Sequence, residues 1–284
     1  MFWNKIKTGL LLGALSGVLL AIGGYLGGTT GLGVGLAIAL TMNIVSYWAS
    51  DKIALKMYRA QKVSKKEQPE LHKIVEEVCK ESNCIKPPVY LIPNDSPNAF
   101  ACGRNEKHSA VAVTRGLLKI LNRDELKGVI AHEIAHIKNR DILIQTVAAA
   151  IAMSISYIAL FARIGAMAGG FGGGGGRGRN AGELIAIAIL TPLMAMLIQL
   201  AISRSREYLA DETGARNIKN NKALASALQK MSKAIDLHPM KKTGTREATA
   251  HMFIANPFRG GFLHLLSTHP PMKKRIERLN NLKV

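Results

Sequence analysis

The feature that most constrains this chain is a stretch from Thr8 to Ser50 that contains no Asp, Glu, Lys or Arg. A run of glycines and threonines, Gly27 to Gly31, divides it near its middle. One helical crossing of a bilayer needs about 20 apolar residues, so the stretch predicts two membrane spans, at 9–27 and 32–49, joined by a tight turn. The alternative, a signal peptide followed by a buried helix, requires a shorter apolar core and a small-residue cleavage site.

A second pair of uncharged runs extends from Ile142 to Ala162 and from Leu184 to Ser203. Both are long enough to cross a bilayer, and buried core helices are the alternative for each. The connector between them contains a glycine tract, Gly172 to Gly176, which disfavours regular structure and predicts a flexible loop outside the hydrocarbon. The predicted organisation is a transmembrane hairpin at 1–50, a polar segment at 51–141, a second transmembrane hairpin at 142–203 and a polar segment at 204–284.

The chain is strongly basic, with 38 Lys and Arg against 19 Asp and Glu and a formal net charge of +19. Basic residues cluster from Lys52 to Lys66, directly after span two, whereas the connector between spans one and two has none. Loops rich in Lys and Arg stay on the cytoplasmic side. We therefore expect a multi-pass protein of a bacterial- or archaeal-type plasma membrane with both termini and both polar segments in the cytoplasm.

Two further features of the composition indicate which partner the chain binds and in which cellular compartment it lies. No basic patch interleaved with aromatic residues points to nucleic acid, so the lipid bilayer is the expected partner. The three cysteines, Cys79, Cys84 and Cys102, fit a reducing cytosolic face and lack the spacing of a zinc knuckle. Against this orientation, the connector between spans three and four carries Arg163, Arg177 and Arg179.

The polar segments predict an α+β fold. Apolar residues at helical spacing predict a helix over 68–82, and three short runs within 89–113 are typical of strands in a small sheet. A further helix begins at Asn122, because Asn122 can cap it while Glu125, three residues on, reaches back to the Asn122 amide. We therefore expect a mostly helical integral membrane protein with a small β-sheet.

The helix that begins at Asn122 carries the sequence His132-Glu133-Ile134-Ala135-His136. Residues four apart share a helix face, so His132 and His136 can offer imidazole nitrogens to one zinc ion. Glu133 lies beside them, where its carboxylate can reach a zinc-bound water without being a ligand. The pattern supplies two metal ligands and a general base.

A catalytic zinc takes three protein ligands and keeps one position open. Six residues separate His136 from the start of the third apolar run, about 9 Å of continuous helix, and the fourth run returns the chain to the same membrane face. Glu207 lies four residues beyond that return, so we expect it to be the third ligand. Asp211, one turn further on, is expected to accept the free N–H of a ligand histidine. The alternative for both carboxylates is a solvated helix face beside neighbouring arginines.

Four segments together, HEIAHIKNRD, SRSREYLAD, NAFACG and STHPPMKKRI, resemble the HtpX family of membrane-bound zinc metalloproteases, which is related to the CAAX prenyl proteases. The resemblance extends over nearly the whole chain. It implies a gluzincin-type catalytic domain that faces the cytoplasm, a zinc ion held by His132, His136 and Glu207, and Glu133 as the catalytic group. It also implies a role in membrane-protein quality control and in the stress response.

The resemblance adds further candidate residues. It implies a strand beside the cleft where a substrate can pair as an added strand, formed by Asn98, Ala99 and Phe100. It also implies that His269 and Arg275 lie near the zinc and stabilise an oxyanion or the carboxylate at position 211. From the residues alone, His269 is equally a loop or cap residue before two prolines, and Arg275 is equally a solvated charge on a helix.

The expected function is a zinc-dependent endopeptidase that cleaves misfolded or unfolded membrane proteins at cytoplasmic segments, with Glu133 as the base for zinc-activated water. One alternative is a four-span metal transporter or channel component, but transport paths need ionisable residues and these spans contain almost none. Another is a proteolytically silent zinc-binding scaffold. Cobalt and manganese are the alternatives to zinc at such a site, although two imidazoles and a carboxylate suit zinc well.

Overall fold

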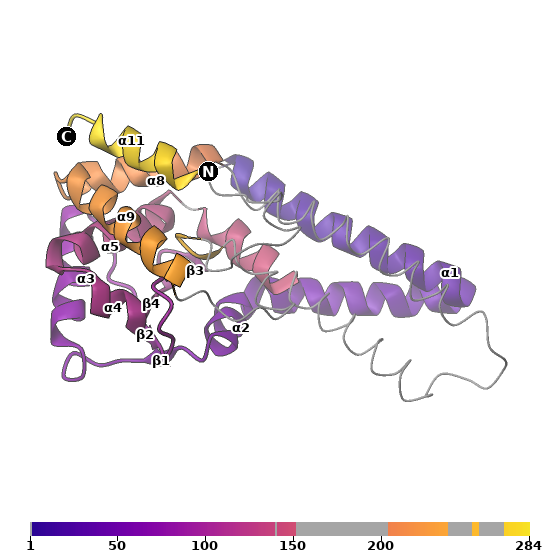
Figure 1. Cartoon of the computed structure of the whole chain (residues 1–284). Coiled ribbons are helices and arrows are strands. Elements are labelled where there is room, and N and C mark those ends of the chain that lie inside the picture. The colour runs from indigo at the N-terminus through magenta and orange to yellow at the C-terminus, as the bar shows by residue number, and fades with distance from the viewer. Residues whose placement is uncertain (1, 140, 152–203, 238–251, 256–269) are drawn as a thin grey trace.

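The uncharged N-terminal stretch forms a helical hairpin that projects from a body of helices and strands, as the computed structural model in Figure 1 shows. The structure describes residues 2–139, 141–151, 204–237, 252–255 and 270–284. The predictions for the end of the third apolar run, for the fourth run, for the glycine tract and for His269 lie outside the described residues.

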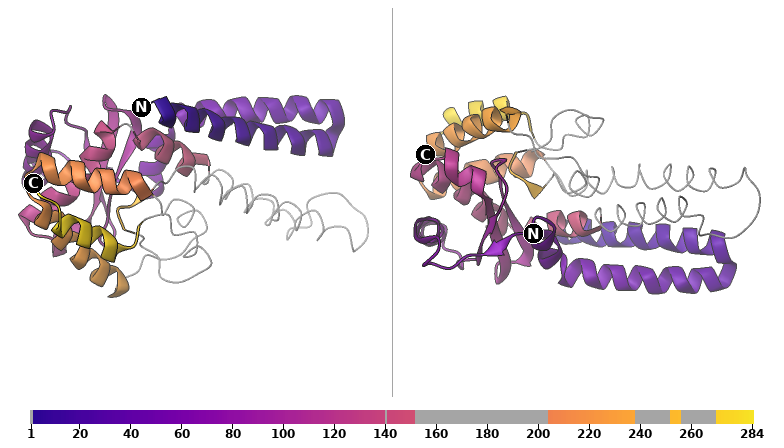
Figure 2. Two further views of the ribbon diagram at one scale, coloured as in Figure 1. Left: turned by 90° about the horizontal axis from the view of Figure 1, so that it is seen from above. Right: turned by 60° about the horizontal axis from the view of Figure 1, so that its bottom comes forward.

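Helix α1 (Phe2–Trp48) contains both arms of this hairpin, which run antiparallel in both views of Figure 2. Gly28 has a positive φ of 55°, a conformation that glycine adopts at no steric cost. Near the turn, the backbones of Gly23 and Gly31 lie so close that a Cβ on either would clash with the carbonyl of the other. Small residues at this contact allow two apolar helices to pack closely, as they do inside membranes.

The surface of the hairpin is apolar along most of its length. Gly28–Trp48 is long and apolar enough to cross a membrane, and Ile6–Ala21 is a shorter apolar helix. Leu10, Ile44 and Trp48 are each about 60 % exposed, an unusual display of large apolar side chains for a surface that faces water. The hairpin therefore suits a lipid environment.

Among the described residues, four strands form one mixed sheet in the order β1-β2-β4-β3. Strand β1 (Gln61–Lys62) is antiparallel to β2 (Val89–Ile92), β2 is parallel to β4 (His108–Thr114), and β3 (Ala99–Asn105) is antiparallel to β4. The predicted fold class, mostly helical with a small sheet, is confirmed. Strand β1 was not predicted, because its two residues are polar and exposed and so do not show the alternation of apolar and polar side chains that marks a strand. Strand β3 occupies an edge of the sheet.

Helices cover both faces of this sheet. The helices of the body are α2 (Ser50–Met57), α3 (Pro69–Glu81), α4 (Arg115–Ile120), α5 (Arg123–Lys138), α8 (Arg204–Asn217), α9 (Asn221–Leu237) and α11 (Met272–Asn280). Side chains alternate along β3, so Ala99 and Ala101 pack into one core with α3, α5 and α9, while Phe100 and Cys102 pack into a second core with α2. The site-bearing helix α5 thus lies between the sheet and the helices α8 and α9.

The start of α5 is fixed by the capping box that the sequence predicts. The Asn122 side chain accepts from the Glu125 amide, and the Glu125 carboxylate accepts from the Asn122 amide. The same carboxylate also accepts from the Ser226 hydroxyl and the Lys230 ammonium of α9. One buried carboxylate therefore caps α5 and fixes α9 against it.

The end of α5 differs from the prediction. The helix ends at Lys138, and a separate apolar helix begins at Ile142, so the assumption of one continuous helix into the third apolar run was wrong. The Asp141 amide donates to the His136 carbonyl. This hydrogen bond holds Asp141 beside the last turn of α5.

Helix α8 packs closely against α5 through Gly214. A Cβ at this position would lie 2.9 Å from backbone atoms of Ala131 and His132, closer than real side chains approach. Gly214→Ala should therefore push α8 away from α5 and destabilise the body by about 1–3 kcal/mol, measured as a lower midpoint of thermal unfolding in detergent. Gly17→Ala, where a Cβ meets nothing within 4 Å, is the control. Equal midpoints for the two variants would contradict this packing.

Candidate metal centre

Helices α5 and α8 bring three potential metal ligands together. His132 and His136 lie one turn apart on α5, and Glu207 lies in the first turn of α8. All three are buried, and one donor atom from each lies within 4.8 Å of the others. Segments about 70 residues apart in sequence thus form one cluster, which is the arrangement expected if the chain returns to the same membrane face through a hairpin.

The separations of these donor atoms fit a single metal ion. The Nε2 atoms of His132 and His136 lie 3.1 Å apart. Glu207 places Oε1 3.5 Å from the Nε2 of His136 and Oε2 3.8 Å from the Nε2 of His132. In a tetrahedral shell with bonds of about 2.0–2.1 Å, neighbouring ligand atoms lie about 3.3 Å apart. Shifts of a few tenths of an ångström would therefore complete the shell.

Two further carboxylates orient the imidazole rings. The Nδ1 of His132 lies 2.9 Å from Oδ1 of Asp211, and the Nδ1 of His136 lies 3.0 Å from Oδ2 of Asp141. A carboxylate beside Nδ1 favours the tautomer that carries its proton there. The Nε2 lone pairs of two neutral rings then face each other, and a shared cation converts this repulsive contact into two bonds.

The charge of the centre also favours a cation. Burial alone would lower the pKa of His136, but the carboxylates of Asp141, Glu207 and Glu133 outweigh burial and raise this pKa to about 10. Burial lowers the pKa of His132, although the Asp211 carboxylate beside its ring favours the charged form. The protein therefore stabilises positive charge between the two rings, and a metal ion supplies such charge with both rings neutral.

Glu133 lies beside the ligands with a carboxylate that is almost completely buried. Burial raises the pKa of this carboxyl to about 7, while the Ala101 amide of β3 donates to it and favours the charged form. A carboxyl group with a pKa near neutrality suits both the uptake and the release of a proton. The position and the pKa of Glu133 thus match a general base.

Arg275 connects the C-terminal helix α11 to the centre. It is fully buried and donates from Nε and Nη2 to the two oxygens of Asp211, at 2.8 and 2.6 Å. Its Nη1 lies 3.7 Å from Oε2 of Glu207. Burial would raise the pKa of Asp211, but Arg275 more than offsets this and lowers it to about 2. Arg275 therefore holds Asp211 ionised beside His132.

The candidate substrate residues lie at the edge strand. Asn98 is fully buried, and its side chain binds the backbone of Ala255. Ala99 begins β3, and the Phe100 ring packs in the core beside α2. The structure thus brings the edge of β3 next to the base, because the amide of Ala101 contacts Glu133.

Sequence reasoning overlooked Asp141. It lies three residues beyond the end of α5, and a carboxylate immediately after a helix that bears histidine ligands is a signal that could have identified it. The wall of the centre was overlooked as well. Gln145 and the segment 252–254 line the pocket that holds the ligands, and these residues share no motif that a single sequence reveals.

Comparisons with known proteins agree with this geometry. The profile of peptidase family M48 matches residues 65–283. A curated protein named Protease HtpX homolog from Pyrococcus furiosus is 53 % identical over 278 residues, covering 98 % of this chain and 95 % of its own. Another of the same name, from Syntrophobacter fumaroxidans, is 48 % identical over 282 residues, covering 98 % and 99 %.

A solved structure shares the fold. The crystal structure of S. mikatae Ste24p superposes with a TM-score of 0.51 at 18 % sequence identity. The likeness covers 98 % of this chain, which spans 65 % of that longer chain. At this identity the comparison shows a common architecture.

The carboxylate behind His136 should tune the metal affinity. In Asp141→Asn, the ring loses the negative charge that orients it, so the affinity for Zn²⁺ should fall about 10- to 100-fold. Competition with a chromogenic chelator measures this change. Asp95→Asn, at an exposed carboxylate paired with Lys119 on the surface, is the matched control and should leave the affinity unchanged. Equal affinities for both variants would show that Asp141 does not position the ligand.

Proposed function

The chain belongs to peptidase family M48 and, within it, to the HtpX proteases, so it is a membrane metalloendopeptidase, and we propose that its metal is zinc held by His132, His136 and Glu207. The observation that carries this proposal is the convergence of two imidazoles and one carboxylate within 4.8 Å of one another, all buried. Two nitrogen donors and one oxygen donor are a set that catalytic zinc sites use.

The chemistry divides between the metal and the protein. Zinc at this centre would polarise the scissile carbonyl and make a bound water a stronger acid. Glu133 takes up a proton and delivers it to the leaving amine, since its carboxyl group is buried beside the ligands and has a pKa near neutrality. The Ala101 amide, which donates to the Glu133 carboxylate, orients it for this transfer.

The buried arginine of the centre, Arg275, positions the ligands. Arg275 makes two hydrogen bonds to Asp211, which in turn contacts the Nδ1 of His132. We propose that Arg275 acts indirectly, through Asp211, and that its positive charge also stabilises Glu207, which lies 3.7 Å away. His269, six residues before Arg275, is proposed as a second group for the developing oxyanion.

The substrate is an extended polypeptide. An edge strand offers backbone donors and acceptors to an added strand, and Asn98, Ala99 and Phe100 begin such an edge beside Glu133. Folded proteins rarely present an extended segment, whereas unfolded segments do. Because the apolar hairpin adjoins the body (Figure 1), we propose that the substrates are misfolded or unfolded membrane proteins cut at cytoplasmic segments, as quality control requires.

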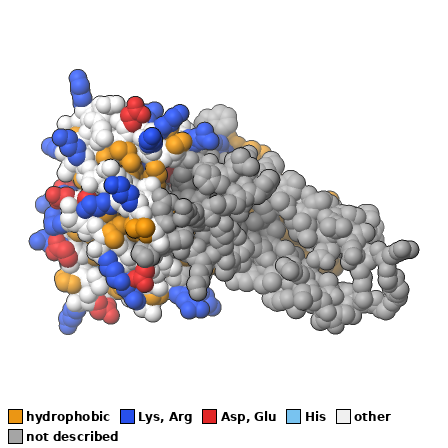
Figure 3. Space-filling model, viewed as in Figure 1, with side chains coloured by type: hydrophobic (Ala, Val, Ile, Leu, Met, Phe, Trp, Pro, Cys, Tyr) orange, Lys and Arg blue, Asp and Glu red, His pale blue; other side chains and the backbone are white. Residues whose placement is uncertain are grey.

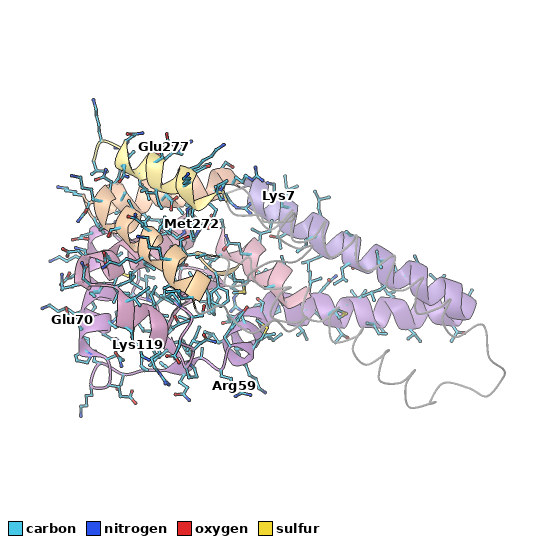
Figure 4. All side chains as sticks on the ribbon, viewed as in Figure 1. Lys7, Arg59, Glu70, Lys119, Met272 and Glu277 are labelled. Carbon is cyan, nitrogen blue, oxygen red and sulfur yellow. The ribbon has the colours of Figure 1, made fainter. Side chains whose placement is uncertain are left out.

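The distribution of charge supports a cytoplasmic body. Figure 4 shows Lys7 and Arg59 near the end of the hairpin that meets the body, and Lys and Arg side chains are abundant on the face of the body in Figure 3. Positive residues that flank apolar helices favour the cytoplasmic side. We propose a multi-pass topology in which the body and both termini face the cytoplasm.

The role of Glu133 is tested by Glu133→Gln. The amide keeps the shape of the side chain but cannot accept the proton, so the rate of casein cleavage should fall by about 10²- to 10⁴-fold while the zinc content stays at wild-type level. Glu277→Gln, at an exposed position on α11 labelled in Figure 4, is the control. Chelator-sensitive cleavage by Glu133→Gln at the wild-type rate would exclude Glu133 as the base.

The topology is tested by reporter fusions. A fluorescent protein that matures only in the cytoplasm should fluoresce when it is joined after Val284. Alkaline phosphatase, which is active only outside, should be active when it is inserted at Gly28 in the hairpin turn and inactive after Val284. The opposite pattern would place the body outside the cytoplasm and contradict the proposed orientation.

A further inference from the structure

The outer edge of β3 is already paired with a segment of the same chain. The Ile254 amide donates to the Ala99 carbonyl at 3.2 Å. The Asn98 side chain donates to the Ala255 carbonyl at 2.6 Å and accepts from the Ala255 amide at 3.3 Å. Position 98 thus lies opposite 255, and 99 opposite 254, so the segment Met252–Ala255, here called the strap, runs antiparallel to β3 as an added strand would.

The strap is fixed by a side chain that enters the second core. Phe253 is fully buried, and its ring centroid lies 4.7 Å from that of Tyr58 and 5.5 Å from that of Phe100. In the register given above, position 253 faces position 100, so this ring contact is the cross-strand pair that an antiparallel alignment predicts. The aromatic cluster therefore holds the strap in one register.

The strap is also linked to the metal centre. Arg275 donates from Nη1 to the Ile254 carbonyl at 2.8 Å, while its other nitrogens bind Asp211. One buried guanidinium thus contacts both the strap and the carboxylate that orients His132. The strap and the ligands are parts of one hydrogen-bonded arrangement.

The strap closes the space in front of the ligands. The pocket at the centre has essentially no space that a water-sized molecule could occupy, whereas pockets that hold drug-sized ligands measure about 300–1,000 Å³. Its lining comes from α5, α8, the helix that begins at Ile142, and the strap, which contributes Met252, Phe253 and Ile254. A polypeptide cannot reach both Glu133 and the β3 edge while the strap keeps this position.

We propose that the strap is an internal pseudosubstrate that inhibits the protease until it leaves the edge of β3. This inference rests on the proposed function, because it takes the β3 edge as the place where a substrate strand pairs. The strap already occupies one backbone group of β3, the Ala99 carbonyl, that such a strand would use. Displacement of residues 252–255 is therefore the step that admits a polypeptide to the centre.

The size of the effect follows from competition between strap and substrate. The apparent affinity for a substrate is the intrinsic affinity multiplied by the fraction of molecules in which the edge is open. One intramolecular hydrogen bond contributes about 0.5–1.5 kcal/mol, so the loss of one strap bond should raise that fraction, while it is small, by about two- to tenfold.

The test weakens the strap without touching the ligands. Ile254→Pro removes the N–H that donates to Ala99, and Phe253→Ala removes the aromatic anchor, with Phe253→Leu as the control that retains an apolar side chain. Each variant is made in the full-length protein in detergent, with and without Glu133→Gln. Thermal unfolding identifies a variant that fails to fold. If either Ile254→Pro or Phe253→Ala fails to fold, the remaining variant is used for the measurements.

Two readouts separate this inference from the proposed function. In the Glu133→Gln background, binding of a fluorescently labelled casein fragment should tighten about two- to tenfold in Ile254→Pro, and by at least as much in Phe253→Ala, which removes a fully buried ring. With Glu133 present, kcat/KM for casein should rise by the same factor. Phe253→Leu should change both quantities less than Phe253→Ala does.

Failure of the pseudosubstrate proposal and failure of the proposed protease function give different results. Unchanged or weaker binding and unchanged or lower kcat/KM in folded strap variants would show that the strap is a fixed wall of the site, and would overturn the pseudosubstrate while leaving the protease intact. If the wild-type protein and every strap variant bound zinc but lacked chelator-sensitive cleavage of casein, the proposed function itself would fail.

Discussion

The site depends on the close packing of α8 against α5, because this contact places a carboxylate in front of two imidazoles in a region from which water is largely excluded. Gly214 allows the two backbones to approach, and Glu207, two turns earlier on α8, then lies level with His132 and His136. Burial of three donor groups without a cation is costly. The same burial becomes favourable when one ion satisfies all three, so packing and metal binding support each other.

The residues that contact the two ligand histidines from the side away from the metal are also buried and charged. Asp141 and Asp211 contact the outer nitrogens of the two rings, and Arg275 holds Asp211 in its charged form. Arg275 belongs to α11, close to the C-terminal end of the chain, and is the largest side chain that is fully buried among the described residues. A buried Arg with an ionised partner is tolerated, whereas either group alone would be strongly destabilising. The C-terminal helix is therefore coupled to the metal centre.

Much of this arrangement follows from local sequence signals. The capping box at Asn122, the spacing of His132 and His136, and the helical period around residues 68–82 are local patterns, and the structure contains the corresponding elements. Glu207 was placed beside the histidines by the expected path of the chain through a hairpin, not by any local pattern. The structure brings the three residues together, although α5 ends before the apolar run that this path assumed to be continuous with it.

Other features were beyond sequence reasoning for physical reasons. The role of Asp141 depends on a break in the helix, and the strand β1 depends on pairing with β2 and not on its own two residues. The alignment of the strap with β3 joins the Asn98 side chain to the backbone of Ala255, 157 residues away, and the Ala99 carbonyl to the Ile254 amide. Hydrogen bonds to the backbone have no signature in the type of the residue that supplies the backbone group. A single sequence therefore reveals side-chain chemistry more readily than contacts made by the main chain.

The central claim is that two imidazoles and the carboxylate at position 207 hold one zinc ion. X-ray absorption at the zinc edge of the purified protein tests it most directly. The account predicts a four-coordinate shell of nitrogen and oxygen atoms at about 2.0–2.1 Å, including two imidazoles, with one oxygen from the protein removed in Glu207→Ala. A shell with sulfur at about 2.3 Å, or one unchanged by Glu207→Ala, would contradict it.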